Sequence, residues 1–196
     1  VMLMLAGALV DSLYSARRIE TEYRHHISAN IARQITFDKL YAHGLQMGQA
    51  LRNVMLDPDN PKAYENYAKA AESFEKLLAS ARDADTQHFR SGLPDKIGTL
   101  RGEQRQIHDQ LFALVKSGQL DAARSTLNKD ETPKWREIRD LLQTEVRRLD
   151  ELSPQLFERL TKQSDESVQR SIALALAAMI LGTLIAAAML SRIARQ

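Results

Sequence analysis

The segment SIALALAAMILGTLIAAAMLS (171–191) contains no charged residue and lies between Arg170 and Arg192. As an α-helix, a segment of this length spans roughly 31 Å, close to the thickness of the hydrocarbon core of a bilayer. An uncharged run of this length is typical of a transmembrane helix and unusual for a soluble one. Arg192 and Arg195 follow directly, and positive residues mark the cytoplasmic side of a span, so we expect 192–196 to begin a cytoplasmic linker.

The first ten residues, VMLMLAGALV (1–10), are apolar but too few to cross a bilayer by themselves. They fit the end of a first transmembrane helix or the tail of a signal peptide, since the small residues at 6–8 resemble a cleavage region. We favour the transmembrane helix because the apolar run passes into a helical pattern without a loop. The sequence then predicts a membrane protein with two spans, in which residues 11–170 form one domain outside the cytoplasm.

Turn residues divide this domain into long helical segments. Glycine, proline and short polar residues gather at four points: DPDNP (57–61), SGLPD (91–95), SGQLD (117–121) and DETP (130–133). Between these points, apolar residues recur every three or four positions, as in an amphipathic helix, and alternating stretches are too short to predict strands. The sequence therefore predicts four helices over about 11–56, 61–90, 95–117 and 133–191, with a short helix over 119–128.

Local signals support two of these helix starts. Asn60 with Pro61, and Thr132 with Pro133, each match a capping residue followed by proline at the first helical position. The apolar stripe of the first helix comprises Ile27, Ile31, Ile35, Tyr41, Leu45, Gly48 and Met55. Pro154 interrupts the fourth helix, where we interpret it as a tolerated kink, with a hinge as the alternative.

The predicted fold class is all-α, with the helices arranged as an up-down four-helix bundle. Its long first and fourth helices continue into the transmembrane helices. The part of the bundle next to the bilayer then comprises these two helices alone, which leaves apolar seams exposed. A second copy of the chain would bury the seams, so we expect a homodimer.

Composition restricts the chemistry and the partners of the chain. The formal net charge of +2 is close to neutral, and acidic residues interrupt the basic ones between Pro133 and Arg148, so we expect no nucleic-acid partner. The chain contains no cysteine, which excludes disulfides and suits a bacterial periplasm. It has no phosphate-binding glycine loop, no serine elbow and no cysteine nucleophile, so we expect it not to be an enzyme.

The histidines show no metal-binding spacing. Neither His-x-x-x-His nor His-Glu-x-x-His occurs, so we predict no metal and no cofactor, although a haem or metal site assembled across helices stays open. We interpret all the histidines as surface or helix-flank residues: His25, His26, His43, His88 and His108.

Two stretches resemble a known family. LQMGQALRNVMLDPDNPKAYENYAKA (45–70) resembles the first turn region of the four-helix-bundle sensor domains of bacterial methyl-accepting chemotaxis receptors. GQLDAARSTLNKDETPKWREIRDLL (118–142) resembles the matching connection and fourth helix. The resemblance implies a transmembrane chemoreceptor of the bacterial inner membrane, in which residues 11–170 form a periplasmic, homodimeric domain that senses a small ligand. The fourth helix would transmit the signal to a cytoplasmic region after Gln196, where cytoplasmic signalling proteins would bind.

Arginines beside the apolar stripes indicate where a ligand would bind. Arg52 shares a face with Leu45 and Gly48, and Arg139 borders the stripe of the fourth helix. Guanidinium groups bind carboxylates through paired hydrogen bonds, and aromatic walls exclude water around them. We therefore predict a site for an organic or amino acid anion, formed by Arg52, Asn53, Tyr64, Tyr67, Trp135, Arg136 and Arg139.

Other interpretations of these residues and of the chain stay open. The arginines could form structural ion pairs and the aromatic residues could pack in the core, since structural ion pairs are commoner than binding sites. Sensing could also require a binding-protein partner. The alternative functions are the sensor domain of a membrane histidine kinase and a dimeric scaffold without a ligand.

Overall fold

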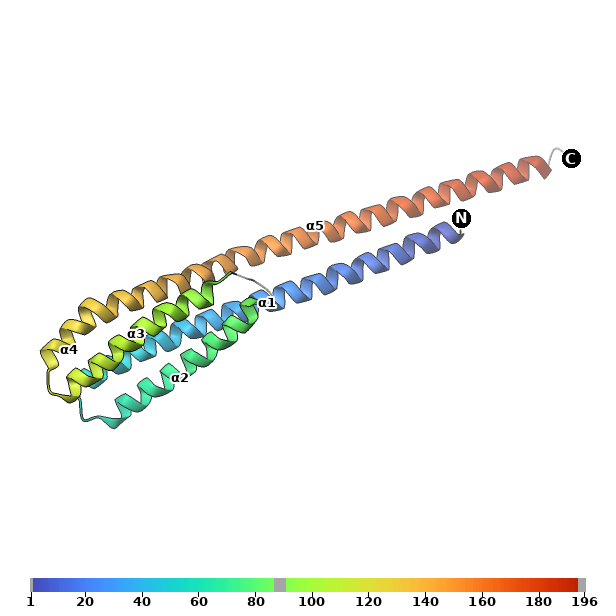
Figure 1. Cartoon of the computed structure of the whole chain (residues 1–196). Helices are drawn as coiled ribbons and strands as arrows, with labels where there is room; N and C mark the ends of the chain where they lie inside the picture. The colour runs from blue at the N-terminus through green and yellow to red at the C-terminus, as the bar shows by residue number, and fades with distance from the viewer. Residues whose placement is uncertain (1, 87–90, 194–196) are drawn as a thin grey trace. The chain divides into compact units, whose positions relative to one another are not determined.

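The computed structural model describes residues 2–86 and 91–193 of the chain. In chain order its elements are α1 (Met2–Leu56), α2 (Pro61–Ala84), α3 (Leu93–Lys116), α4 (Leu120–Thr126), the π-helical turn η2 (Leu127–Glu131) and α5 (Thr132–Ile193) (Figure 1). The described residues contain no strand, which confirms the all-α prediction.

The turn between α1 and α2 forms where the sequence predicts it. Asn60 adopts an extended backbone, and its side-chain oxygen accepts a hydrogen bond of 3.0 Å from the backbone N–H of Lys62. Pro61 occupies the first helical turn, where its missing N–H leaves no hydrogen bond unmade. The predicted cap at Asn60 is confirmed. Of the predicted helix over 61–90, α2 covers 61–84, the π-helical residues Asp85 and Thr86 follow, and 87–90 lie outside the described residues, as do 194–196 of the predicted linker.

The predicted break at 130–133 is wrong. Residues Leu127–Glu131 form the π-helical turn η2, and α5 follows without a gap from Thr132. Thr132 has helical backbone angles (φ −60°, ψ −43°), so it does not act as a cap. Pro133 has no backbone N–H to donate, and it directly follows the π-helical turn, where the hydrogen-bond pattern already departs from that of an α-helix.

The chain forms two compact units. Unit 1 consists of residues 1–28 and 152–196, and unit 2 consists of residues 29–151. In unit 1, α5 continues through Pro154, and its Thr161–Ile193 segment contains a window of 18 residues with a mean hydropathy of 2.4. Among the described residues, this is the one helical segment long and apolar enough to cross a membrane, and it contains the predicted span 171–191. The N-terminal apolar run is helical from Met2, and its role as a first span stays a prediction.

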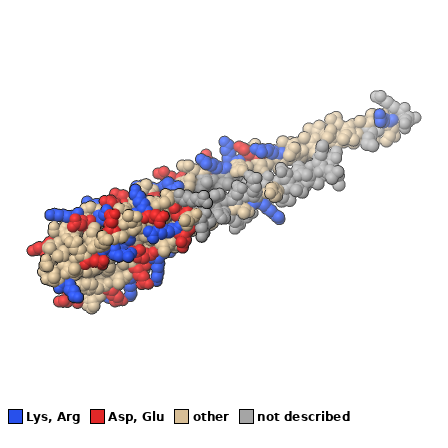
Figure 2. Space-filling view, viewed as in Figure 1, with Lys and Arg blue, Asp and Glu red and all other residues tan. Residues whose placement is uncertain are grey.

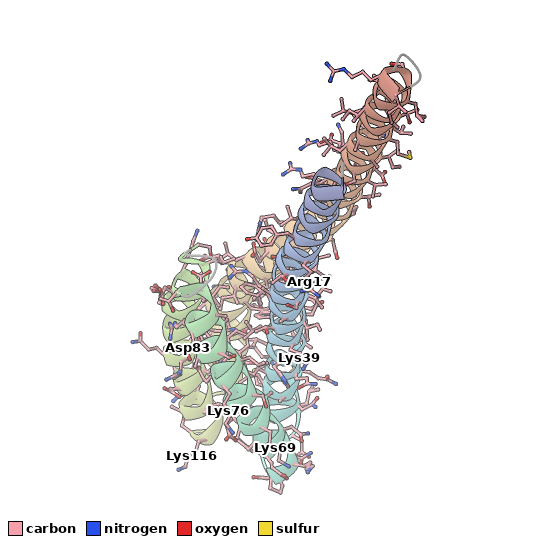
Figure 3. All side chains as sticks on the ribbon, turned by 90° about the vertical axis from the view of Figure 1, so that its right-hand side faces the viewer. Arg17, Lys39, Lys69, Lys76, Asp83 and Lys116 are labelled. Carbon is pink, nitrogen blue, oxygen red and sulfur yellow. The ribbon has the colours of Figure 1, made fainter. Side chains whose placement is uncertain are left out.

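Unit 2 contains the core. Segments of α1, α2, α3 and α5 lie side by side and contribute to one apolar cluster (Figures 1 and 3). Its buried residues are Phe37, Leu40, Met47, Ala70, Phe74, Leu78, Ala81, Ile97, Ile138 and Leu142. A second cluster near the connection between α3 and α4 comprises Leu51, Val54, Ala63, Leu111, Val115, Ala123 and Leu127. Removal of these side chains from water is the main force that assembles the helices.

The core face of α1 differs from the apolar stripe of the sequence analysis. Ile31, Ile35 and Leu45 are 46%, 47% and 45% exposed, whereas Phe37 and Leu40 are fully buried. Two apolar faces therefore run along α1, and only the face with Phe37 and Leu40 packs within unit 2. On the side of unit 2 that Figure 2 shows, positive and negative side chains are interspersed.

Candidate functional site

A polar groove lies between α1 and α2 in unit 2. Its volume is about 400 Å³, and its lining consists of His43, Gln46, Gln49, Ala50, Asn53, Asn66, Lys69, Ala70 and Ser73. We call this the α1–α2 groove. Its two helices lie side by side in Figure 3, where Lys39 marks α1 and Lys69 marks α2. Ala50 and Ala70 are buried, and their small side chains leave room between the helices.

Helix geometry explains why these polar residues meet. The two helices are antiparallel and joined by the short turn after Leu56, so residues equally distant from the turn lie opposite each other. Asn53 and Asn66 lie near the turn on the two helices, Gln46 and Ser73 lie farther from it, and all four line the groove. On each helix the lining residues recur at spacings of three and four, which places them on one face.

The charged residue of the groove belongs to a small ionic cluster. Glu65 accepts a hydrogen bond of 2.5 Å from Lys69 Nζ and one of 2.9 Å from Lys62 Nζ. These bonds, that from Lys69 first, lower the pKa of Glu65 to about 2. One carboxylate thus serves two ammonium groups, which leaves this edge of the groove with a net positive charge.

His43 contributes a second ionisable group. Its Nδ1 lies 3.0 Å from Oε1 of Gln46. An amide oxygen can only accept a hydrogen bond, so Nδ1 carries a proton in this contact. In the neutral ring, Nε2 is then the acceptor.

The structure distributes the seven predicted site residues over unit 2. Asn53 lines the groove, whereas Arg52 and Arg136 are exposed on α1 and α5. Arg139 donates to Asp140 through Nε and Nη2, at 3.0 and 2.8 Å. The seven residues therefore do not share the α1–α2 groove, and their role as one site stays a prediction.

The three aromatic members of the predicted set make packing contacts. Tyr64 and Tyr67 both contact the ring of Phe112 on α3, with centroids 5.7 and 4.8 Å apart. Trp135 stacks on Tyr41 at 6.3 Å and covers Gly44, where a Cβ atom would collide with the indole ring. These contacts account for the half-buried positions of the three rings.

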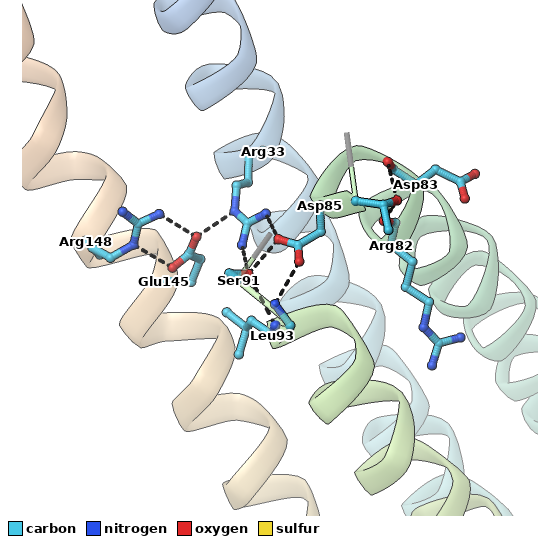
Figure 4. Close-up of polar contacts among 10 residues, drawn as sticks. Arg33, Arg82, Asp83, Asp85, Ser91, Leu93, Glu145 and Arg148 are labelled. Atoms are coloured by element: carbon cyan, nitrogen blue, oxygen red, sulfur yellow. Dashed lines mark hydrogen bonds and ion pairs between the residues drawn. The ribbon is translucent and has the colours of Figure 1, made fainter. Parts of the chain in front are cut away.

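A buried ionic cluster joins three helices at the other end of α2. Arg33 on α1 donates from Nη1 to Asp85 at 2.7 Å and from Nε to Glu145 on α5 at 2.6 Å (Figure 4). Its Nη2 donates to Ser91 Oγ at 2.9 Å, and Arg148 binds both oxygens of Glu145 at 2.8 Å. We call this the Arg33 cluster.

The Arg33 cluster keeps its carboxylates charged. Burial raises the pKa of Asp85, but the hydrogen bonds from Ser91, Arg33 and the backbone N–H of Gly92 outweigh it and hold the pKa below its ordinary value. Burial likewise raises the pKa of Glu145, and Arg148 and Arg33 lower it by more. The cluster is therefore a charge-assisted tie between α1, α5 and the start of α3.

A second buried polar cluster surrounds His108 on α3. His108 Nδ1 lies 2.7 Å from the Tyr67 hydroxyl, and Nε2 lies 3.4 Å from Oε1 of Glu131 in η2. Gln104 donates to the same Glu131 oxygen at 3.1 Å, and Arg101 Nη1 donates to Gln104 at 3.1 Å. We call this the His108 cluster.

Burial lowers the pKa of His108, so the ring is neutral at pH 7. A carboxylate can only accept, so Nε2 carries the proton toward Glu131 and Nδ1 accepts the Tyr67 hydroxyl. The interpretation of His108 as a surface or flank residue is wrong, because its side chain is fully buried. The burial of His108 could have been predicted from its helix face, because it shares one stripe of α3 with Ile97, Arg101, Gln104 and Leu111.

Comparison with protein-family models, curated proteins and solved structures gives no significant match. Among the described residues, no group of three or more histidine and acidic side chains is placed to hold a metal ion.

Proposed function

We propose that this chain is the sensor region of a transmembrane chemoreceptor of the bacterial inner membrane. Unit 2 would be an up-down four-helix bundle in the periplasm that binds a small anionic ligand. The observation that carries the proposal is the continuity of α5, which is one helix from Thr132 to Ile193. It contributes Ile138 and Leu142 to the core of unit 2 and contains the candidate span Thr161–Ile193.

Continuity gives such a protein a way to transmit a signal. Pro154 removes one backbone hydrogen bond from α5, but the backbone is helical on both sides of it, so a displacement of the first part of the helix moves the last part as well. A ligand drives that displacement only by the difference between its affinities for the two positions. The contact of Glu145 on α5 with Arg33 on α1 would couple α5 to the helix that lines the groove.

The proposed receptor is a homodimer that pairs through the exposed apolar face of α1. Ile31 and Ile35 are four residues apart, and Leu45 lies two heptads after Ile31. Side chains at these spacings form the seam of a coiled coil, and burying them against a second copy removes apolar surface from water.

Single cysteines test the dimer cleanly, because the natural chain has none. In membranes, Ile35→Cys should form disulfide-linked dimers on mild oxidation. Lys76→Cys, on the exposed surface of α2, is the control and should stay monomeric. Equal crosslinking of both variants would argue against pairing through α1.

A chimera tests the receptor function. The chain is joined to the cytoplasmic region of a chemoreceptor with a measurable kinase output and expressed in cells that lack other receptors. We expect at least one organic or amino acid anion to change kinase output saturably. A chimera that inserts, folds and dimerises but answers no such compound would contradict the proposal.

The same assay tests the residues predicted from the sequence. Arg52→Ala and Arg139→Ala should weaken the response if their guanidinium groups bind the anion. Arg124→Ala is the matched control, since Arg124 is an exposed arginine paired with Asp121 on α4. An unchanged response in the first two variants would remove these arginines from the site.

A further inference from the structure

We propose that the α1–α2 groove binds a small polyhydroxylated carboxylate, an open-chain compound with one carboxylate and several hydroxyl groups. The inference rests on the proposed sensor function and gives that function a ligand class and a location. It shares Asn53 with the residue set predicted from the sequence and otherwise places the ligand on different side chains.

The lining of the groove selects for hydrogen bonds. Four of its described residues carry carboxamides, and a serine adds a hydroxyl: Gln46, Gln49, Asn53, Asn66 and Ser73. Each carboxamide both donates and accepts hydrogen bonds, as a ligand hydroxyl also does. No phenylalanine, tyrosine, tryptophan or carboxylate side chain is among the described lining residues, so the groove offers no large ring for stacking and no anionic partner for a cation.

The charge of the groove selects for one carboxylate. Lys69 is the one lysine or arginine among the described lining residues, and its ammonium group is exposed and bonded to Glu65. A ligand carboxylate can replace Glu65 as the partner of Lys69 at little cost in free energy, because exposed ion pairs are weak. Lys62 continues to neutralise Glu65. A hydrogen bond from an ammonium group to a carboxylate is among the stronger polar contacts available there.

His43 completes the arrangement. Its Nδ1 donates to Gln46, so Nε2 is the ring nitrogen left for a hydrogen bond with a ligand hydroxyl. The groove volume of about 400 Å³ lies near the lower end of the range of small-molecule sites, roughly 300–1,000 Å³. These features fit a compact ligand with a carboxylate at one end and hydroxyl groups along its length.

A second copy of the chain is a poor occupant of this groove. Its polar lining would lose water without gaining apolar contact, whereas the exposed Ile31, Ile35 and Leu45 face suits a helix of a second copy. The groove and the proposed dimer seam therefore have different chemistry on the same helix.

Three probes of related shape test the ligand class on the full chain in lipid nanodiscs. Gluconate has the groups that define the class, one carboxylate and several hydroxyl groups along an open chain. Glucitol keeps the hydroxyls without the carboxylate, and hexanoate keeps the carboxylate without the hydroxyls. By titration calorimetry, gluconate should bind saturably and at least about tenfold more tightly than either control, since each control loses one set of hydrogen bonds. Failure of gluconate to bind to folded chain, or equal binding of all three probes, overturns the ligand class.

Matched variants test the location. Lys69→Gln should weaken gluconate binding by about tenfold, through loss of a charge-assisted hydrogen bond. Lys76→Gln should leave it unchanged, although Lys76 forms the same kind of exposed pair with Glu72 four residues away on the same helix. Asn66→Leu should also weaken binding while preserving the helical circular dichroism spectrum. Equal gluconate affinity in Lys69→Gln, Asn66→Leu and the unchanged chain overturns the assignment to the groove.

The chimera separates this inference from the proposed function. Gluconate binding that depends on Lys69, with no change of kinase output, supports the groove and counts against the receptor role. A kinase response to another anion that is unaffected by Lys69→Gln supports the receptor role and overturns the groove as its site.

Discussion

Unit 2 contains two buried polar clusters that are held together in different ways. The Arg33 cluster consists of full charges, in which one guanidinium group lies between Asp85 and Glu145. The His108 cluster is arranged around a neutral ring that accepts from Tyr67 and donates toward Glu131. Both replace water with hydrogen bonds inside the protein, but in the first the opposite charges contact each other directly, whereas in the second Gln104 lies between the charges of Arg101 and Glu131.

The difference bears on how each cluster responds to change. Removing one ion of a buried pair leaves an uncompensated charge, which costs more than an unmade neutral hydrogen bond. The Arg33 cluster ties α1 to α5, the helix through which we propose a signal passes, whereas the His108 cluster ties α2 and α3 to the turn that precedes α5. The first is therefore the stronger candidate for a constraint on α5.

The largest expected effect is that of Arg33→Met. Methionine retains much of the volume but leaves Asp85 and Glu145 without their shared cation, and we expect unit 2 to lose about 3–5 kcal/mol of stability at pH 7. Thermal and denaturant unfolding followed by circular dichroism measure it. Arg124→Met, at an exposed ion pair, is the control and should cost less than about 1 kcal/mol. Similar losses in both variants would mean that the Arg33 cluster contributes no more than a surface pair.

Acid should remove this effect. The pKa values of Asp85 and Glu145 are lowered from 3.8 and 4.5, so the folded state binds fewer protons than the unfolded state. The stability that these groups contribute is present above those ordinary values and is lost as the pH falls through the lowered ones. Unfolding measured from pH 7 to pH 3 should show the difference between Arg33→Met and the unchanged chain shrinking at the acid end. A constant difference would argue that Arg33 acts through packing alone.

The elements of this fold were predictable where the signal is local. Asn60 and Pro61 encode a helix start within a few residues, and the structure confirms it. The core face of α1 was not predictable in this way, because Phe37 and Leu40 on one face and Ile31 and Ile35 on another are both spaced as residues on one side of a helix. Periodicity finds an apolar stripe but does not tell which of two stripes packs within the chain.

The groove and the clusters depend on contacts between distant residues. The closeness of Asn53 and Asn66 could have been predicted, because both lie near the turn that joins two predicted antiparallel helices. The contact of His108 with Glu131 could not have been predicted, because Glu131 lies in a π-helical turn where the sequence predicts a loop. The contact between Arg33 and Glu145 joins positions 112 residues apart, and no local pattern specifies it.

A smaller effect is expected from His108→Gln. Glutamine keeps a donor and an acceptor but cannot span both Tyr67 and Glu131, so we expect a loss of about 1–3 kcal/mol at pH 7. The lowered pKa of His108 means that its stability contribution is present above the ordinary value of 6.5 and declines as the pH falls. Unfolding at pH 7 and pH 5.5 should therefore show less acid destabilisation in His108→Gln than in the unchanged chain. His43→Gln controls for an exposed histidine, and an identical pH dependence in all three proteins would contradict the neutral buried ring.

The smallest effect on stability is expected from Arg105→Gln, which tests whether the His108 cluster depends on the ion pairs that Glu75 forms beside it. Arg105 is half exposed and shares Glu75 with the buried Arg101, whose Nε lies 3.2 Å from the same carboxylate oxygen. Arg101 lacks a well-aligned hydrogen bond at Nε, so Glu75 is free to move closer once Arg105 is gone. We expect a change of less than about 1 kcal/mol, as for other exposed pairs.

Glu75→Gln removes the charge opposite a buried guanidinium group and should cost more, by the argument that applies to Arg33. A larger loss of stability in Arg105→Gln than in Glu75→Gln would mean that the exposed pair of Arg105 matters more than the charge opposite Arg101. The argument from the Arg33 cluster would then not apply to Glu75.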